Sequence, residues 1–273
     1  MAKQKLQEDI EKEALITAVE PAKPVVVPPV FDIAAWSPKT ALGRAVKEGK
    51  LTAIDQILNA GLAIKEPEIV DALLPGLEFE LLLVGQAKGK FGGGKRRAFR
   101  QTQKKTAEGN KPHFVTVAAT GNRDGFVGLG YGKAKETVPS REKAIRNAKL
   151  RIIKIRRGCG SWQCGCRSPH SLPFKVRGKS GSVELELLPA PKGTGLCIET
   201  ECAKFLALAG IKDIWSRSSG TTSTKLNMVL ACYDALRKTM RLKIKAEHVS
   251  ALGIAEGRAL IAPSVPTGRQ EDE

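Results

Sequence analysis

A cluster of potential metal ligands occupies twelve residues in the middle of the chain. Cys159, Cys164, Cys166 and His170 follow the spacing C-x4-C-x-C-x3-H, with glycine and proline between them for tight turns. Three thiolates and one imidazole form a closed tetrahedral set, which suits a structural zinc ion and leaves no open position for catalysis. The spacing therefore predicts a structural zinc site.

Two other interpretations of this cluster stay open at the level of sequence. The cysteines could be free thiols in a loop, or they could hold an iron–sulfur cluster. The spacing differs from the common ferredoxin runs, and histidine ligation is unusual there. We expect no metal role for Cys197, Cys202 and Cys232, because the last two fall within expected helices, where cysteine packs as a small hydrophobe.

A Gly- and base-rich run from Lys88 to Lys105 contains eight basic and no acidic side chains. Glycines let a backbone approach phosphates closely, and the neighbouring basic side chains supply neutralising charge and planar donors. We expect this run to bind RNA phosphates, with a solvated loop as the alternative. Its candidate RNA-binding residues are Lys88, Lys90, Lys95, Arg96, Arg97, Phe99, Arg100, Lys104 and Lys105.

Phe99 is expected either to pack at a hairpin tip or to stack on RNA. A second candidate RNA-binding patch lies near the start of an expected helix. It comprises Lys133, Lys135, Arg141 and Lys143.

The charge of the chain also points to a polyanionic partner. Its 273 residues have a net charge of +17, which divides into −4 over residues 1–80 and +21 over residues 81–273. Aromatic residues make up only 5%, too few for binding single strands mainly by stacking bases. No run of 18 apolar residues and no apolar signal core occur, so we expect a cytoplasmic protein without a membrane partner.

The glycine-rich stretch from Gly121 to Lys135 does not match a nucleotide-binding loop. A dinucleotide fingerprint places its glycines on the turn that joins a strand directly to a helix. Here Gly128, Gly130 and Gly132 alternate with larger residues, which is strand period, and they lie well before the expected helix. No GxxxxGK[ST] motif occurs. A nucleotide-binding enzyme is therefore disfavoured.

The hydrophobic pattern predicts an α+β fold of two modules in series, preceded by a Pro-rich arm over residues 1–30. Helices are expected within 37–61 and at 66–74, 138–155 (N-cap Thr137), 200–209 (N-cap Thr200) and 226–238. Strands are expected at 78–86, 115–119, 126–129 and 182–188. In the helix at 138–155, the expected buried stripe is Ile145, Ala148, Ile152 and Ile153.

Several motifs together resemble the ribosomal protein S5 family (uS5). They are NRDGFVGLGYGKAKE from Asn122, GKSGS at 178–182, LPAPKGTG at 188–195 and LAGIKDI at 208–214. The resemblance covers about residues 65–242. The segments 65–71 and 156–173 are similar to the archaeal and eukaryotic branch, and the three clustered cysteines to the archaeal type in particular.

The resemblance implies a double-stranded-RNA-binding-domain-like (dsRBD-like) module followed by an S5 domain-2-like α+β module, with a helical N-terminal extension. It maps the family's RNA-facing hairpin loop onto Gly94–Arg100 and makes residues 101–112 a long insert in that hairpin. The expected division is an arm and helical extension at 1–64, the dsRBD-like module at 65–156, a zinc-binding connector at 157–173, the second module at 174–245 and a tail at 246–273.

The resemblance also implies a function without enzymatic activity. Family members are structural components of the small ribosomal subunit that bind rRNA near the mRNA entrance and decoding region. They lie beside ribosomal proteins S3, S4 and S8 and support assembly and translational accuracy. The competing classes are a free RNA-binding regulator and a metal-dependent RNA-processing enzyme. The enzyme is disfavoured because Glu184 and Glu186 share one strand face without a nearby histidine, and the ligand cluster is closed.

Overall fold

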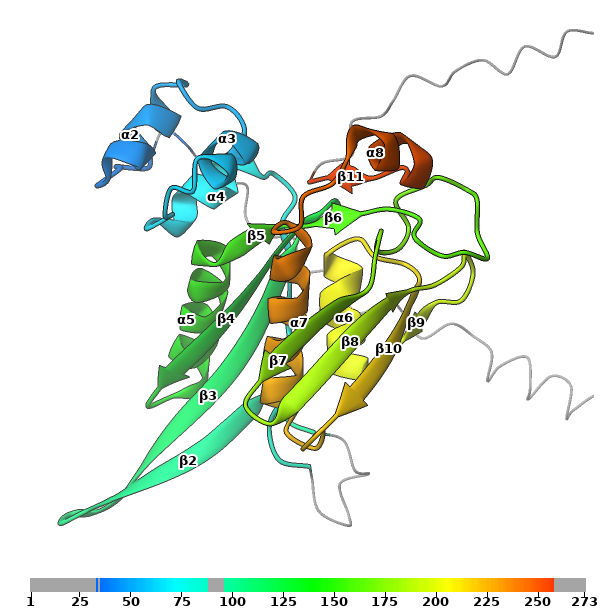
Figure 1. Ribbon diagram of the computed structural model, residues 1–273. Coiled ribbons are helices and arrows are strands. Elements are labelled where there is room, and N and C mark those ends of the chain that lie inside the picture. Colours follow the sequence, from blue (N-terminus) through cyan, green and yellow to red (C-terminus); the bar gives the residue numbers. More distant parts are fainter. Residues whose placement is uncertain (1–32, 34, 88–95, 258–273) are drawn as a thin grey trace, which may run out of the picture. The chain divides into compact units, whose positions relative to one another are not determined.

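The computed structural model describes residue 33, residues 35–87 and residues 96–257 (Figure 1). Its first elements are three short helices, α2 (Ala41–Lys47), α3 (Ile54–Asn59) and α4 (Pro67–Leu73). The Thr40 side chain caps α2, and Pro67 occupies the first turn of α4, where a missing N–H leaves no bond unmade. The three helices share a small core that includes the fully buried Ile57 and Ile69.

The next elements form a five-stranded antiparallel sheet, and one helix, α5 (Thr137–Leu150), packs on β3 and β4. The strands are β1 (Glu78–Leu81), β2 (Phe99–Thr106), β3 (Gly109–Gly121), β4 (Phe126–Ala134) and β5 (Ile152–Lys154). Their order is β1–β3–β4–β5, and β2 pairs with β3. The strands expected at 115–119 and 126–129 lie within β3 and β4, whereas the one expected at 78–86 ends at Leu81.

Gly128, Gly130 and Gly132 lie on β4, so the prediction that they belong to a strand is confirmed. A Cβ atom on Gly130 would lie 2.1 Å from the carbonyl oxygen of Ala144, and one on Gly132 would lie 2.1 Å from that of Ser140. Only glycine therefore lets β4 approach α5 this closely. The opposing helix residues repeat every four positions and are Ser140, Ala144 and Ala148, all buried.

The expected helix at 138–155 is wrong at both ends. Thr137 is the first helical residue rather than the N-cap, and no side chain caps this end. The helix ends at Leu150, because Ile152 and Ile153 pair instead with residues of β4. β-Branched side chains favour such pairing. Of the expected buried stripe, Ala148 is confirmed, Ile145 is only half-buried, and the other buried residues of α5 are Ser140 and Ala144.

The second sheet has four strands in the order β7–β8–β10–β9. Their bounds are β7 (Val176–Ser180), β8 (Val183–Pro189), β9 (Leu196–Cys197) and β10 (Ile214–Ser219). α7 (Lys225–Thr239) packs on β7 and β8, and α6 (Thr200–Leu208) contacts α7 and β3. The strand expected at 182–188 corresponds to β8, and the helix expected at 226–238 corresponds to α7.

The N-cap of α6 is Glu199, and the expectation that Thr200 caps this helix is wrong. The Glu199 carboxylate accepts hydrogen bonds from the N–H groups of Glu201 and Cys202 at 3.1 and 3.2 Å. A carboxylate at this position also interacts favourably with the helix dipole. The expected stop at Gly210 is confirmed, since this residue follows the helix with φ +82°.

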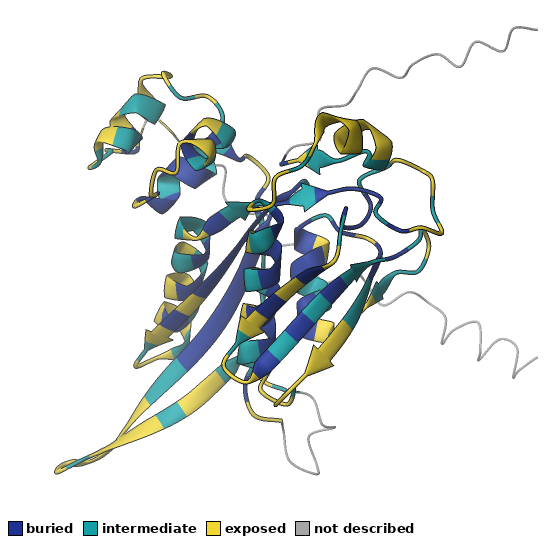
Figure 2. Cartoon of the chain, viewed as in Figure 1, coloured by how far each residue is buried: buried dark blue, intermediate teal, exposed yellow. Residues whose placement is uncertain are grey.

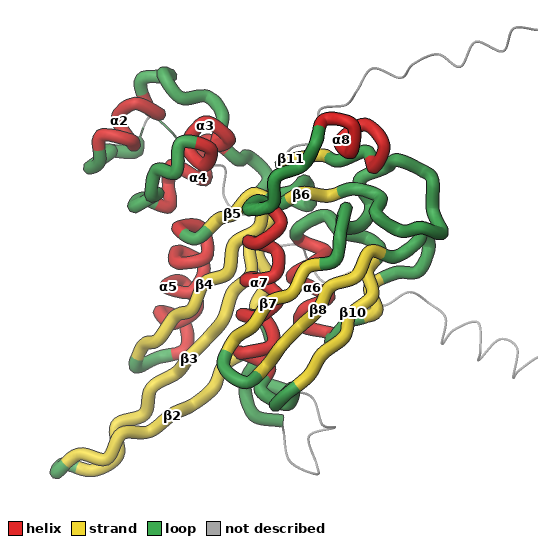
Figure 3. Tube along the Cα trace, viewed as in Figure 1, coloured by secondary structure: helices red, strands yellow, loops and turns green. Residues whose placement is uncertain are grey.

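Between the two sheets, β6 (Arg156–Arg157) leads into a long loop that reaches β7 (Figure 3). After α7, the chain forms α8 (Ala246–Leu252) and β11 (Ala255–Glu256), and β11 pairs antiparallel with β6. One hydrophobic core includes Val117 and Leu129 of the first sheet together with Leu185 of the second. Within the described residues, every helix is too short or too polar to cross a membrane.

Candidate nucleic-acid interface and metal centre

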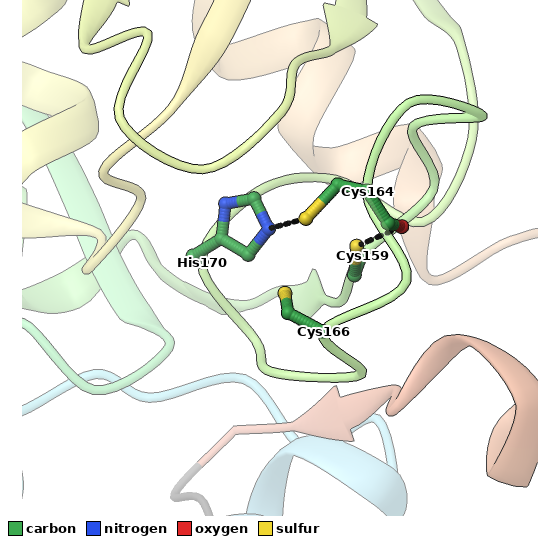
Figure 4. Close-up of side chains that lie close together, drawn as sticks. All are labelled: Cys159, Cys164, Cys166 and His170. Atoms are coloured by element: carbon green, nitrogen blue, oxygen red, sulfur yellow. Dashed lines mark hydrogen bonds between the residues drawn. The ribbon is translucent and has the colours of Figure 1, made fainter.

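The four candidate metal ligands come together in the loop between β6 and β7, as Figure 4 shows. Their ligand atoms all lie within 4.8 Å of one another. Cys164 Sγ lies 3.8 Å from His170 Nε2, and Cys159 Sγ donates a hydrogen bond to the Cys164 carbonyl at 3.0 Å. A tetrahedral zinc ion separates such ligand atoms by roughly 3.5–3.8 Å. A contraction of about 1 Å at the longest separation would therefore close the set around a metal.

Backbone hydrogen bonds hold the loop that carries these ligands. Gly158 and Ser171 exchange two bonds of 2.9 and 3.0 Å, and the Cys159 N–H donates to the Leu252 carbonyl at 2.9 Å. Gly160 approaches the opposite side of the loop so closely that a Cβ atom would lie 2.1 Å from the Pro173 carbonyl oxygen. The first and last ligands are thus anchored on two neighbouring extended segments.

His170 is oriented by a buried carboxylate that sequence reasoning missed. Asp213 Oδ2 lies 2.8 Å from His170 Nδ1, and both side chains are almost fully buried. The other carboxylate oxygen, Oδ1, accepts hydrogen bonds from the N–H groups of Gly193 and Gly195 at 3.0 and 2.9 Å. This arrangement places the proton of the neutral imidazole on Nδ1 and turns Nε2 toward the thiols, which is the tautomer a metal ligand needs.

The thiols of the cluster differ in acidity. Burial, reinforced by hydrogen bonds with Cys166 and Cys164, raises the pKa of Cys159 to about 11. Hydrogen bonds from the side chain and backbone of Ser168 lower the pKa of the exposed Cys166 to about 6. At neutral pH the set therefore begins with a thiolate at its exposed side, and a bound cation would displace the remaining thiol protons. The other three cysteines lie elsewhere, and Cys202 and Cys232 are buried in α6 and α7.

The second candidate site is the hairpin formed by β2 and β3. Phe99 pairs with Thr116 at its base, and Thr106 pairs with Gly109 beside a two-residue turn. Exposure increases along the hairpin toward this turn (Figure 2). Arg100, Lys104 and Lys105 of β2 are exposed. The hairpin therefore offers extended, solvent-facing basic strands.

The predicted position of the hairpin loop is wrong. Residues 101–112 do not form a loop insert: residues 101–106 and 109–112 are the distal parts of the paired strands, and residues 107 and 108 are the turn between them. Phe99 consequently lies at the base of the hairpin rather than at its tip, where its ring packs edge-to-face on Phe114 with centroids 5.7 Å apart. The candidate residues Lys88, Lys90 and Lys95 lie outside the described residues.

The candidate RNA-binding side chains that are described have a property in common. None of them forms an ion pair with another residue that the structure describes, whereas some bases elsewhere do: Lys149 pairs with Asp71 and Arg157 with Asp124. Charge that no acid neutralises is available to phosphates. These unpaired bases are Arg96, Arg97, Arg100, Lys104, Lys105, Lys133, Lys135, Arg141 and Lys143.

The second candidate patch lies where β4 ends and α5 begins. Lys133 is exposed on β4 directly opposite Val115 of β3, and Lys135 follows that strand. Arg141 and Lys143 lie in the first turns of α5, and the Nε atom of Arg141 is buried without a hydrogen-bond partner among the described residues. The two candidate patches thus lie on or beside the sheet that contains β3 and on α5, the helix packed against it.

Comparison with known proteins identifies the two halves of the chain separately. Residues 98–156 match the family model described as ribosomal protein S5, N-terminal domain, and residues 178–248 match ribosomal protein S5, C-terminal domain. The predicted resemblance is therefore confirmed by matches that include most of both sheets.

Archaeal relatives extend the match over most of the chain. The small ribosomal subunit protein uS5 of Nanoarchaeum equitans is 50% identical over 84% of this chain and 98% of its own length. Those of Pyrobaculum aerophilum and Methanocaldococcus jannaschii are 50% and 47% identical, over 79% and 84% of this chain and 92% and 99% of their own lengths. All three are named ribosomal proteins rather than enzymes, as expected for this chain. The chain belongs to the uS5 family of small ribosomal subunit proteins.

Proposed function

We propose that this protein is a structural component of the small ribosomal subunit that binds rRNA through the β2–β3 hairpin and the start of α5. The observation that carries the proposal is that nine bases lie on and beside β2, at the end of β4 and at the start of α5, and that none of the nine has an acidic partner among the described residues. Unneutralised bases on extended strands release counterions when they meet phosphates, and this release supplies most of the electrostatic affinity for RNA.

The arrangement around β3 supports a dsRBD-like module over residues 65–156. The chain order is a helix, α4, then the antiparallel strands β1, β2, β3 and β4, and then a second helix, α5. Lys149 of α5 and Asp71 of α4 form an ion pair at 2.7 Å that joins the two helices. Modules of this type read the shape of A-form RNA more than its sequence, so we expect weak sequence discrimination from this part.

The proposed location follows from family membership. We place the protein near the mRNA entrance and decoding region, beside ribosomal proteins S3, S4 and S8, where it supports assembly and translational accuracy. The helical extension before residue 65, the connector at 157–173 and the second module at 174–245 are parts of the same proposal. Co-sedimentation tests it: the protein should remain stoichiometric with small subunits after a high-salt wash, and a mostly free protein would indicate a regulator instead.

We also propose that the Cys/His cluster holds one zinc ion as a structural cross-link. Cys159, Cys164, Cys166 and His170 would supply all four ligands, and the Asp213 contact supports this because it exposes Nε2 to the thiols. A bound zinc ion would stabilise a loop that has little hydrophobic core of its own. The set leaves no position for a substrate, so its role is structural.

The basic segment that leads into β2 can be tested through the salt dependence of RNA binding. Replacing Lys95, Arg96, Arg97 and Arg100 by Ala should lower the slope of log affinity against log salt by about three units or more, since each phosphate contact contributes about 0.9 on duplex-like RNA. The measurement is a filter-binding titration of a small-subunit rRNA transcript between low and moderate salt. An unchanged slope would remove this part of the chain from the interface.

A matched control uses four bases that already have acidic partners. Lys175 and Arg177 of the β7 region pair with Glu186 and Glu184, Lys179 pairs with Glu184, and Lys238 pairs with Asp234. Replacing these four by Ala removes the same formal charge, yet the slope should change by less than about one unit because their charge is already neutralised. Equal effects of the two variants would mean that only net charge matters.

A further inference from the structure

Trp162 is the most exposed large hydrophobic side chain in the described part of the chain, with 88% of its surface accessible. The other two tryptophans differ, since Trp36 is only 9% exposed and Trp215 is half-buried. Isolated exposed apolar residues are common, but an indole has a large apolar surface and is enriched at binding sites. Its position between Cys159 and Cys164 places it in the loop of the Cys/His cluster.

The backbone on both sides of Trp162 is held in place. Ser161, which precedes it, is buried, and its carbonyl accepts a hydrogen bond from the Cys164 N–H at 3.2 Å. The Ser161 hydroxyl accepts another from the Gln163 N–H at 3.4 Å, and Gly160 donates to Leu172 at 3.2 Å. The indole therefore extends from an anchored turn, so little conformational entropy is lost when a partner covers it.

The charge around this loop favours RNA over protein as the partner. The loop itself, residues 158–174, contains one Arg and no Asp or Glu. Arg167 lies in the same loop, and Lys212 is attached to it because its N–H donates to the His170 carbonyl at 2.8 Å. Both side chains are exposed, and neither forms an ion pair with any residue that the structure describes. An exposed aromatic ring among free bases is typical of sites that stack an unpaired nucleotide.

We propose that Trp162 stacks on an unpaired RNA base, with Arg167 and Lys212 contacting the flanking phosphates. This inference rests on the proposed function, because it assumes an RNA partner. It adds a second kind of contact: the bases of the hairpin bind RNA phosphates, whereas Trp162 stacks on the face of a nucleotide base. One such anchor is compatible with the low aromatic content, since stacking is not the main source of affinity.

Fluorine NMR of the full-length chain with 5-fluorotryptophan tests the proposal. The three tryptophans give three signals, and Trp162→Phe assigns the one of interest. A single-stranded 12-nucleotide oligoadenylate should shift the Trp162 signal, whereas a duplex RNA of the same length and heparin should not, because neither offers an unpaired base. The signals of Trp36 and Trp215 should stay in place and report that the fold is intact.

Affinity provides the second readout. Trp162→Ala should weaken oligoadenylate binding by about 5- to 150-fold, while Trp162→Phe, which keeps a ring, should lose far less. The salt slope should be unchanged in both variants, because no charge is removed. Equal affinities of the wild type and Trp162→Ala, or an oligoadenylate-independent Trp162 signal, would overturn the proposal.

The remaining outcomes separate this inference from the proposed function. A shift of the Trp162 signal by heparin as large as that by oligoadenylate would show that charge alone acts at this loop. A shift only on addition of purified small-subunit proteins would assign Trp162 to a protein interface, and both results would overturn base stacking. The variant with Lys95, Arg96, Arg97 and Arg100 replaced by Ala reports on the proposed function independently, since it leaves the loop of the Cys/His cluster unchanged.

Discussion

Asp213→Asn is a change of one atom that should alter how His170 presents itself to a metal. Asp213 Oδ1 accepts two hydrogen bonds, from the N–H groups of Gly193 and Gly195. An asparagine will keep its carbonyl oxygen there, which forces its amide NH2 group to face His170 Nδ1, where Oδ2 now lies at 2.8 Å. The amide then donates to Nδ1, and the imidazole proton moves to Nε2, the atom that must bind the metal.

The size of the effect follows from these contacts. Outer partners of metal-binding histidines typically change metal affinity by about 10- to 100-fold, which is about 1.4–2.8 kcal/mol. The opposite orientation of the amide does not avoid the loss of zinc affinity. It would aim the NH2 group at the N–H groups of Gly193 and Gly195 and remove the acceptor of both part-buried hydrogen bonds, at a cost of about 1 kcal/mol each. We therefore expect at least a tenfold loss of zinc affinity in either orientation.

Competition between the full-length protein and a chromophoric chelator measures this loss. Asp234→Asn is the matched control, since Asp234 pairs with Lys238 on α7, outside the Cys/His cluster, and its zinc affinity should stay within twofold. The thermal midpoint in excess chelator should differ less between wild type and Asp213→Asn than the midpoint with zinc. An Asp213→Asn protein that binds zinc as tightly as wild type would refute the reasoning about the tautomer.

Three further outcomes are expected. Cys164→Ser should remove the one zinc ion per chain and disorder residues 156–173, whereas Cys197→Ser should do neither. Elemental analysis and thiol titration measure these effects. A folded, zinc-free wild-type protein with reactive thiols would contradict the expectation. Gly130→Ala should lower the free energy of unfolding, measured in urea, by at least about 2 kcal/mol, because the added Cβ atom would collide with the backbone of α5. Gly165 has open space around it, so Gly165→Ala should change the free energy of unfolding by less than about 0.5 kcal/mol. Burial raises the pKa of Glu66, but hydrogen bonds from Thr40 and Lys39 outweigh this effect, so the net pKa is lowered. The contribution of Glu66 to the stability of the fold is therefore complete above the ordinary carboxyl pKa of 4.5 and is lost as the pH falls through the lowered pKa. Glu66→Gln should flatten this acid limb in a stability–pH series, and parallel profiles would exclude the assignment.

Helices and strands that show a clear hydrophobic period within their own residues could be predicted from the sequence. The alternation of β8 and the four-residue spacing of α7 are local patterns, and both elements appear where they were expected. β9 is two residues long and exists because Leu196 and Cys197 pair with β10, so no local pattern marks it. Ile152 was assigned to a helix for the same reason: its partner on β4 lies more than twenty residues away and is absent from the local period.

The candidate site shows the same division. The four metal ligands lie within twelve residues, so their type and spacing alone predict that they meet. Asp213, which orients His170, is separated from it by 43 positions and carries no signature of its role. In the hairpin, the basic character of the chain was visible in the sequence. The position of the turn was not, because it depends on the register between β2 and β3.

The pairing of β6 with β11 has a consequence for the order of events during synthesis. Cys159 donates its N–H to Leu252, and Arg156 forms an ion pair with Glu256, so the loop of the Cys/His cluster depends on residues made about eighty to one hundred positions later. At about 5–20 residues per second, roughly 4 to 16 seconds separate the emergence of His170 from that of Leu252. During this interval the nascent chain carries all of its metal ligands without the segment that closes over them. The cluster therefore reaches its final backbone environment only after Leu252 has been made.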